Sequence, residues 1–174
     1  MEPGFASTQR ALRVHKLFRP FADHYEVRTP AGDPVGYVHR RRDHWQATAY
    51  PDQRKQRTIF ELADKLHAPA VVSDAADTVI GLVCRAGAWF GRTDWRIEQG
   101  DLEATGREAS AVGAFLRAFG APFSFLPSRY AFTIGGVPAV TIRRHFGYRT
   151  RFSADIPDSR LDRRLVAAAM IELD

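Results

Sequence analysis

The stretch LDRRLVAAAMIELD, residues 161–174, decides the fold. Apolar residues run without interruption from Leu165 to Ile171, in a segment whose composition is typical of a helix. Because an α-helix turns once every ~3.6 residues, this run leaves no polar face. Such a helix either enters a membrane or is surrounded by protein. A transmembrane helix needs roughly 20 mostly apolar residues. The segment is shorter and contains Arg163 and Arg164, so we predict no membrane span and a helix enclosed by protein.

The remainder of the chain is typical of short strands joined by turns. YEVRTPAGDPVGYVHRR (25–41) alternates apolar and polar residues on both sides of a Pro/Gly/Asp turn, which indicates a hairpin. AVVSDAADTVIGLVCR (70–85) superposes on it without gaps at an offset of 45, with Gly36 over Gly81. The sequence therefore predicts a duplicated hairpin in which each glycine marks a bulge or a close backbone approach.

Further strands follow the same alternation. They are predicted in ALRVHKLF (11–18), HWQATAYPDQRKQRTIFELAD (44–64), DWRIEQGDLEATGRE (94–108), YAFTIGGVPAVTIRR (130–144) and GYRTRFSADI (147–156). About twelve strands at this spacing predict an all-β fold with added α-structure, a closed barrel. A barrel of this size has an interior that a central helix can fill.

The closing segment supplies that helix. Its core positions are predicted to be Leu161, Leu165, Val166, Ala168, Ala169 and Met170. Ser159 and Asp162 have the spacing of a capping box, so the helix is predicted to begin near Ser159. EASAVGAFLRAFG (108–120) has the spacing of a second, short peripheral helix. We expect a flexible N-terminus over residues 1–8 and a single domain over residues 9–174.

These features together resemble the tubby C-terminal-like superfamily, in the branch of the LURP-one-related and phospholipid-scramblase-like proteins. The resemblance rests on RVHKLF (13–18) followed by YEVRTPAGDPVGYV (25–38), its copy AVVSDAADTVIGLV (70–83), TDWRIEQGD (93–101) and IPDSRLDRRLVAAAMIELD (156–174). It implies a twelve-stranded barrel around a buried C-terminal helix, an association with membrane lipids and no established catalysis. The chain departs from the family because it has no palmitoylation-type cysteine cluster, no clear phosphoinositide-type lysine pair and no scramblase-type acidic calcium loop.

Composition and charge are those of an ordinary globular protein with a basic bias. The formal net charge is +5, supplied almost entirely by arginine, which favours anionic partners. Cys84 is the single cysteine, so a disulfide framework is excluded. Because the first residues lack the pattern of a secretory signal, we expect a cytoplasmic protein, peripheral at the membrane where it binds lipid.

Two arginine clusters are the candidate binding residues. HRRRDH (39–44) lies at a predicted strand end, and RRH (143–145) is followed by more arginines on one strand face. Arginines that converge on one patch bind phosphate well, although a solvated rim with acidic partners explains the same pattern. The candidates for an anionic ligand are Arg40, Arg41, Arg42, Arg143, Arg144 and Arg151. Arg163 and Arg164 are predicted to pair at the barrel mouth with nearby acids such as Asp155 and Asp158.

Other chemistries find little support in the sequence. The aromatic residues of RRHFGYRTRF (143–152) alternate with its arginines, which is barrel patterning, and no nucleic-acid partner is expected. Common catalytic motifs are absent, and Cys84 alternates with Ile80 and Leu82 as a strand residue would. Asp155, Asp158 and Asp162 cluster before the last helix as calcium ligands would, but helix capping and compensation of the helix dipole explain Asp158 and Asp162 more simply. We expect no cofactor and no metal.

The sequence thus predicts a non-enzymatic binding or scaffold protein. Its partner would be an anionic ligand, such as a phospholipid or phosphoinositide head group at a membrane surface. Two alternatives stay open. One is a protein–protein interaction module, which would expose an apolar patch. The other is a small-ligand binder or enzyme that uses a cavity between helix and barrel.

Overall fold

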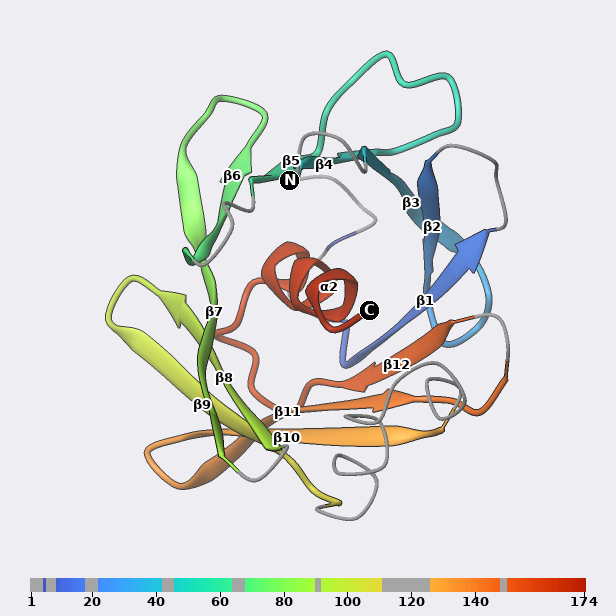
Figure 1. The fold of residues 1–174 in the computed structure, drawn as a ribbon. Helices are drawn as coiled ribbons and strands as arrows, with labels where there is room; N and C mark the ends of the chain where they lie inside the picture. Colours follow the sequence, from blue (N-terminus) through green and yellow to red (C-terminus); the bar gives the residue numbers. More distant parts are fainter. Residues whose placement is uncertain are drawn as a thin grey trace.

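The computed structural model shows a closed antiparallel barrel around a helix (Figure 1). It describes residues 5, 9–17, 22–41, 46–63, 68–89, 92–110, 126–147 and 150–174. Within these residues the elements in chain order are β1 (Ala11–Leu17), β2 (Asp23–Arg28), β3 (Pro34–Arg41), β4 (Gln46–Tyr50), β5 (Phe60–Ala63), β6 (Ala70–Asp74), β7 (Val79–Trp89), β8 (Arg92–Gln99), β9 (Leu102–Glu108), β10 (Ser128–Ile134), β11 (Val137–Arg144), β12 (Arg151–Asp155) and α2 (Arg163–Glu172).

The first and last strands close the ring. β1 pairs with β2 on one side and with β12 on the other, and the remaining strands follow in chain order. Val14 on β1 faces Val27 and Phe152 across these two pairings, and all three side chains are buried. Closure pairs both edges of each of the twelve described strands, so none of these strands has an edge free to pair with another chain. The predicted all-β barrel of about twelve strands is confirmed.

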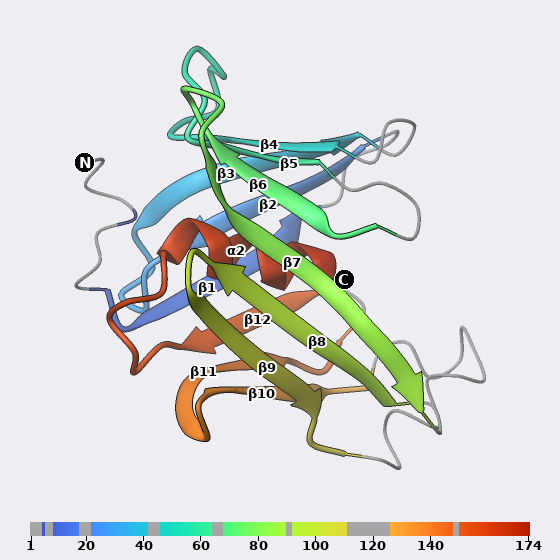
Figure 2. The same cartoon turned by 90° about the vertical axis from the view of Figure 1, so that its left-hand side faces the viewer.

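Helix α2 fills the barrel. It runs through the middle of the ring and contacts β7, β1 and β12 (Figures 1 and 2). The core positions predicted from the sequence are confirmed, because Leu161, Leu165, Val166, Ala168, Ala169 and Met170 are each at most 1% exposed. Its small residues let the helix approach the wall closely. The all-round apolar surface is thus explained by burial within the protein.

The predicted start of this helix is wrong by one turn. Leu161 precedes the helix, and Asp162 is the N-cap, with a carboxylate oxygen accepting a hydrogen bond from the backbone N–H of Arg164 at 2.8 Å. Ser159 lies in a turn, where the carboxylate of Asp158 accepts from the backbone N–H of Arg160. The sequence suggests a single capping box, whereas the structure has a turn capped by Asp158 followed by a helix capped by Asp162.

Arg163 is buried at the start of α2. Its guanidinium donates to the backbone carbonyls of Gln9, Asp158 and Leu161, at 2.6, 3.1 and 2.6 Å. Burial lowers its pKa from the ordinary value, against the opposing charges of Asp162 and Asp158. The predicted pairing with rim carboxylates is therefore replaced, in these contacts, by bonds to carbonyl groups. Arg164 pairs with Asp162, with Nη2 and Oδ2 2.6 Å apart.

The duplicated hairpin has the same geometry in both copies. Val27 faces Gly36 and Val72 faces Gly81, and each pairing is followed by a register shift at the next residue. Gly32 and Asp77 occupy equivalent positions in the two turns, and both have a positive φ, 101° and 61°. Their backbone N–H groups donate to equivalent carbonyls, at 3.0 Å each. The bulge predicted at each glycine is confirmed.

Of the two equivalent glycines, Gly81 has the closer contacts with surrounding atoms. A Cβ atom there would collide with the backbone oxygen of Glu98 and lie 2.8 Å from Cδ2 of Leu165. At the equivalent Gly36 the nearest atom would be the oxygen of Tyr50, at 3.0 Å. We expect Gly81→Ala to lower the free energy of unfolding by about 2–4 kcal/mol. Gly36→Ala is the matched control, and urea denaturation of both should show a clearly smaller loss for it. Equal losses would contradict the close approach at Gly81.

Two sequence predictions fall mainly outside the described residues. The proposed peripheral helix lies there from residue 111 onward, and of the N-terminal segment only residue 5 is described. Phe5 is buried, and its ring packs edge-on against Phe60 with centroids 6.0 Å apart. The domain boundary at residue 9 stays a prediction.

Candidate functional site

The arginines predicted to bind a ligand lie on different sides of the barrel wall. Arg40 on β3 and Arg144 on β11 point inward, toward the end of α2. Nη1 of Arg40 donates to the carbonyl of Ile171 at 3.2 Å, and Nη2 lies 3.4 Å from Oε1 of Glu172. Nη2 of Arg144 lies 3.8 Å from Oδ1 of Asp174. Both therefore neutralise the helix end, where carbonyl groups carry the negative end of the dipole.

Asp174 is the centre of this inward-facing network. Its Oδ2 accepts from Nζ of Lys16 at 2.8 Å and from the hydroxyl of Tyr25 at 2.9 Å, and its Oδ1 accepts from Oγ1 of Thr150 at 2.7 Å. Burial alone would raise its pKa, but the hydrogen bonds from Lys16 and Thr150 and the Lys16 charge outweigh it and hold the pKa below the ordinary value. Burial and the Asp174 carboxylate raise the pKa of Tyr25. The network fastens α2 to the wall.

The other predicted arginines divide differently. Arg41 is exposed on the outside of β3, and Arg42 lies outside the described residues. Arg143 on β11 and Arg151 on β12 are exposed on the outside of the barrel. Their strands are direct neighbours. Of the six candidates, Arg143 and Arg151 thus share one outer surface.

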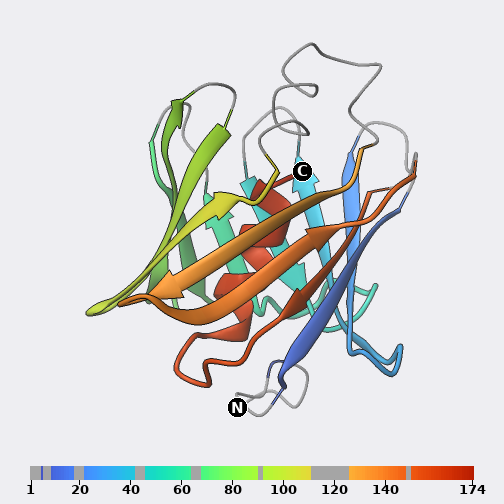
Figure 3. The same ribbon diagram turned by 90° about the horizontal axis from the view of Figure 1, so that it is seen from below.

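Strand register extends this surface across five strands. Arg129 on β10 faces Arg143, which faces Ser153 on β12; Ser153 faces Arg13 on β1, which faces Arg28 on β2. Figure 3 shows β10, β11, β12 and β1 side by side on this face of the barrel. We call it the basic face. Its residues are Arg13, His15, Arg28, Arg129, Arg143, His145, Arg151 and Ser153.

Most arginines of the basic face have no acidic partner in the part of the chain that the structure describes. Arg28 pairs with Glu26, its Nη2 lying 2.7 Å from a carboxylate oxygen. The remaining four make no side-chain hydrogen bond or ion pair with the part of the chain that the structure describes; they are Arg13, Arg129, Arg143 and Arg151. Elsewhere, exposed Arg107 and Arg160 are each paired with an aspartate. The basic face is therefore a local concentration of positive charge in which four of the five arginines have no ion-pair partner among the described residues.

The pKa of His15 is shifted by the charged side chains of the basic face. It lies on β1 opposite Arg151 on one side and Glu26 on the other. Burial lowers its pKa, and the charges of Arg151 and Arg28 lower it further; the Glu26 carboxylate opposes them, and Arg13 has the smallest lowering effect. A lowered pKa means that the imidazole is neutral at physiological pH. His15 therefore adds no positive charge to that of the arginines.

Two hollows on this surface share Arg143. One, of about 470 Å³, is lined by Arg129, Arg143, His145 and Phe146, among others, and the Phe146 side chain is 68% exposed. The other, of about 310 Å³, is lined by Arg13, Thr141, Arg143, Ser153 and Asp155, among others. His145 Nε2 and Ser153 Oγ are hydrogen bonded at 2.9 Å. The basic face therefore combines positive charge with two concave regions in which a ligand could lie.

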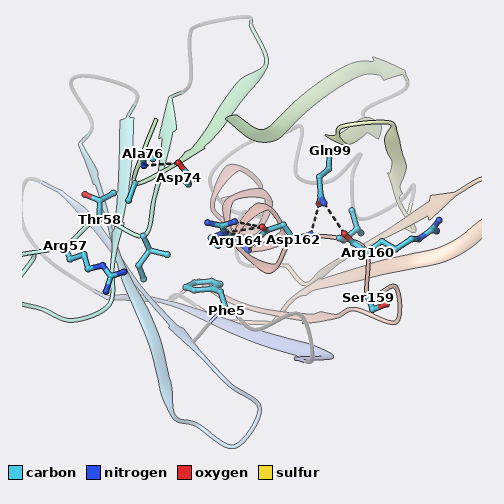
Figure 4. A pocket seen from close by; sticks show the side chains of 13 residues that line it. Phe5, Arg57, Thr58, Asp74, Ala76, Gln99, Ser159, Arg160, Asp162 and Arg164 are labelled. Carbon is cyan, nitrogen blue, oxygen red and sulfur yellow. Dashed lines mark hydrogen bonds and ion pairs between the residues drawn. The ribbon is translucent and has the colours of Figure 1, made fainter. Parts of the chain in front are cut away.

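A further pocket, of about 430 Å³, lies at the mouth where α2 begins (Figure 4). Phe5, Ile59 and Leu161 give it buried apolar lining. Gln99 on its rim accepts from the backbone N–H of Asp162 at 2.7 Å and donates to the carbonyl of Arg160 at 3.0 Å. Since these polar groups satisfy one another, the arrangement fits closure of the barrel mouth better than a site of chemistry.

The remaining sequence candidates lie in structural contacts. Burial and the nearby Glu98 carboxylate raise the pKa of the Cys84 thiol, which disfavours the thiolate needed for nucleophilic attack. Asp158 pairs with Arg160, and Asp162 caps α2. Among the described residues, no cluster of three or more His, Cys, Asp or Glu side chains is arranged to hold a metal ion.

Sequence reasoning missed most of the basic face. Only Arg143 and Arg151 were among the predicted binding residues; the six that were missed are Arg13, His15, Arg28, Arg129, His145 and Ser153. The signal that could have found them is strand parity, because each alternates with residues predicted to face inward. Parity gives the side of the wall for each strand separately, whereas their alignment depends on the register between strands.

Comparison of the chain with protein-family models, with curated proteins and with solved structures finds no match. The fold itself defines the class: a closed antiparallel barrel of twelve described strands with one C-terminal helix, consistent with the tubby-like fold. In the described part of the chain, no helix has the length and apolar character that crossing a membrane requires.

Proposed function

We propose that this protein is a non-enzymatic binding protein that attaches peripherally to anionic phospholipid surfaces through the basic face. The supporting observation is the set of four arginines, Arg13, Arg129, Arg143 and Arg151, that share one outer surface and have no acidic partner among the described residues. The sequence motifs and the central-helix barrel also support our proposal that the chain is a tubby-like protein of the LURP-one-related and scramblase-like branch.

Like charges placed opposite each other support a role in binding. Arg129 and Arg143 face each other directly on β10 and β11, and both are exposed. Such cross-strand pairs destabilise a sheet unless something neutralises them. Arginine forms two parallel hydrogen bonds to a phosphate group, so a phospholipid surface would relieve the repulsion at both residues.

Phe146 adds an apolar contact at the edge of the same surface. It lines one hollow together with Arg129 and Arg143, and its side chain is largely exposed. Exposed apolar side chains such as phenylalanine insert at the boundary between the head groups and the acyl chains of a bilayer, close to the phosphates that arginines bind. A cationic surface with an adjacent exposed ring suits a lipid surface better than a purely aqueous anion.

The test is co-sedimentation with vesicles of phosphatidylcholine containing increasing phosphatidylserine. Each arginine near such a surface contributes about 1 kcal/mol, so Arg13→Gln together with Arg143→Gln should weaken binding roughly 30-fold. Binding should also weaken as the salt concentration rises from about 0.1 M to about 0.5 M, because the charges lie in solvent and are screened.

The charge-matched control is Arg96→Gln with Arg107→Gln. These arginines lie on β8 and β9, are solvent-accessible and pair with local acids. The control protein loses the same formal charge and should retain binding close to that of the unmodified protein. Equal weakening in both double variants would show that net charge alone governs binding, and indifference to phosphatidylserine content would contradict the proposal.

A further inference from the structure

The hollow around Ser153 has a regular arrangement of polar side chains. In one row, Arg143 on β11, Ser153 on β12 and Arg13 on β1 face one another. In the next row, Thr141 faces Asp155, which also faces Ala11. Neighbouring strands lie about 4.8 Å apart, so the two arginines flank the serine hydroxyl at similar spacing. The same hollow, of about 310 Å³, includes side chains of both rows.

The first row suits a phosphate monoester. Two guanidinium groups that approach from opposite sides can each bind two phosphate oxygens, and a dianion benefits from both charges. Neither Arg13 nor Arg143 makes a side-chain hydrogen bond or ion pair with the described residues. Neither arginine would therefore have to give up a described partner in order to bind.

His145 prepares the serine between them. Its Nε2 lies 2.9 Å from Oγ of Ser153. When Nε2 carries the hydrogen, the imidazole donates to the serine oxygen, and the serine hydroxyl is left to donate to a phosphate oxygen. A hydroxyl held in this way loses less rotational freedom when a ligand binds.

The second row points to the carrier of the phosphate. Asp155 is exposed and lies two residues from Ser153 on the same side of β12, about 7 Å along the strand. A carboxylate at that distance opposes a second anion but accepts hydrogen bonds from hydroxyl groups. Thr141 beside it can donate or accept. A hydroxylated carrier would thus satisfy the second row while its phosphate occupies the first.

We propose that this hollow binds phosphate monoesters of polyols, with Arg13, Arg143 and Ser153 at the phosphate and Asp155 and Thr141 at the hydroxyl groups. The inference rests on the proposed function, because it assigns a ligand class to part of the basic face. The monoester can belong to a soluble metabolite or to a lipid head group, since both present the same chemistry.

The first experiment titrates the full-length protein with soluble probes, followed by NMR or calorimetry. Glycerol 3-phosphate should bind about tenfold more tightly than glycerophosphocholine, a phosphodiester, because the dianion gains a second charged contact. Ser153→Ala should weaken glycerol 3-phosphate about tenfold. Ser159→Ala, an exposed serine at the barrel mouth, is the matched control and should have no effect. Asp155→Asn should weaken glycerol 3-phosphate more than inorganic phosphate.

The second experiment separates lipid and soluble sources. Vesicles of phosphatidic acid, a lipid monoester, are compared with phosphatidylserine vesicles of equal surface charge. A preference for phosphatidic acid that Ser153→Ala removes identifies the lipid source, and binding of glycerol 3-phosphate without such a preference identifies the soluble source. Both outcomes support the monoester site.

Failure of this inference differs from failure of the proposed function. If the phosphodiester binds as well as the monoester, or if Ser153→Ala behaves like Ser159→Ala, the monoester site is overturned while binding to phosphatidylserine vesicles can persist. If glycerol 3-phosphate binds at Ser153 and anionic vesicles do not bind, the membrane role is overturned and the monoester site stands.

Discussion

A chain that lacks residues 159–174 is expected to be unfolded, with loss of the far-ultraviolet circular dichroism of the sheet and of the dispersed amide signals in NMR spectra. The deletion removes α2, whose residues from Leu165 to Ile171 are buried throughout. Twelve strands would then surround an empty interior. Because protein interiors are packed as densely as organic crystals, the wall would collapse or open.

The magnitude supports complete unfolding. Leu165, Val166, Met170 and Ile171 are fully buried, and burying such a side chain contributes about 1.5–3 kcal/mol. Together they contribute roughly 6–12 kcal/mol, against a total stability of about 5–15 kcal/mol for a domain. A truncated chain that keeps native dispersion and cooperative unfolding would contradict the role of α2 as the core of the barrel.

A pair of single substitutions tests the same point in the full-length chain. Val166→Asp places a carboxylate at a position that is 0% exposed, and it should cost about 4 kcal/mol or more. Val79→Asp makes the same chemical change at a position on β7 that is 58% exposed, and it should cost less than about 1 kcal/mol. Urea denaturation monitored by tryptophan fluorescence measures both.

The fold could be predicted because its decisive patterns are local. An uninterrupted apolar helix demands a protein environment, and alternation about turn residues identifies each hairpin without knowledge of its neighbours. The duplicated hairpin was visible for the same reason, with Gly36 and Gly81 at matching positions. The helix start was less accessible, since Asp158 and Asp162 are both acceptable caps and their backbone hydrogen bonds decide between them.

The candidate surface was only partly predictable because it depends on long-range register. Arg13 and Ser153 are direct partners on β1 and β12, although they lie at opposite ends of the sequence. Nothing in either strand alone specifies that alignment. Arg40 and Arg144 illustrate the converse: clustering suggested a common ligand, whereas parity turns both toward the acidic end of α2. Arginine clusters at strand ends therefore divide between the two sides of a barrel wall.

The network around Asp174 gives the second large expected effect. Asp174→Asn should lower the free energy of unfolding at pH 7 by about 2–4 kcal/mol, because it removes a buried charge partner from Lys16 and weakens the acceptor for Tyr25 and Thr150. Asp94→Asn, at the exposed ion pair with Arg107, is the control and should cost less than about 1 kcal/mol.

The effect of Asp174 should also depend on pH in a defined direction. Hydrogen bonds from Lys16 and Thr150 outweigh the effect of burial and hold its folded-state pKa below the ordinary value, which is about 3.9 for an aspartate. A group with a lowered folded-state pKa stabilises the protein fully above its unfolded-state pKa and progressively less as pH falls through the folded-state value. The difference in unfolding free energy between the unmodified protein and Asp174→Asn should therefore be constant from about pH 6 to 8 and shrink below about pH 4. Urea denaturation across this range measures it, and a difference that stays constant down to pH values where aspartates are protonated would show that the Asp174 charge does not hold α2 in the barrel.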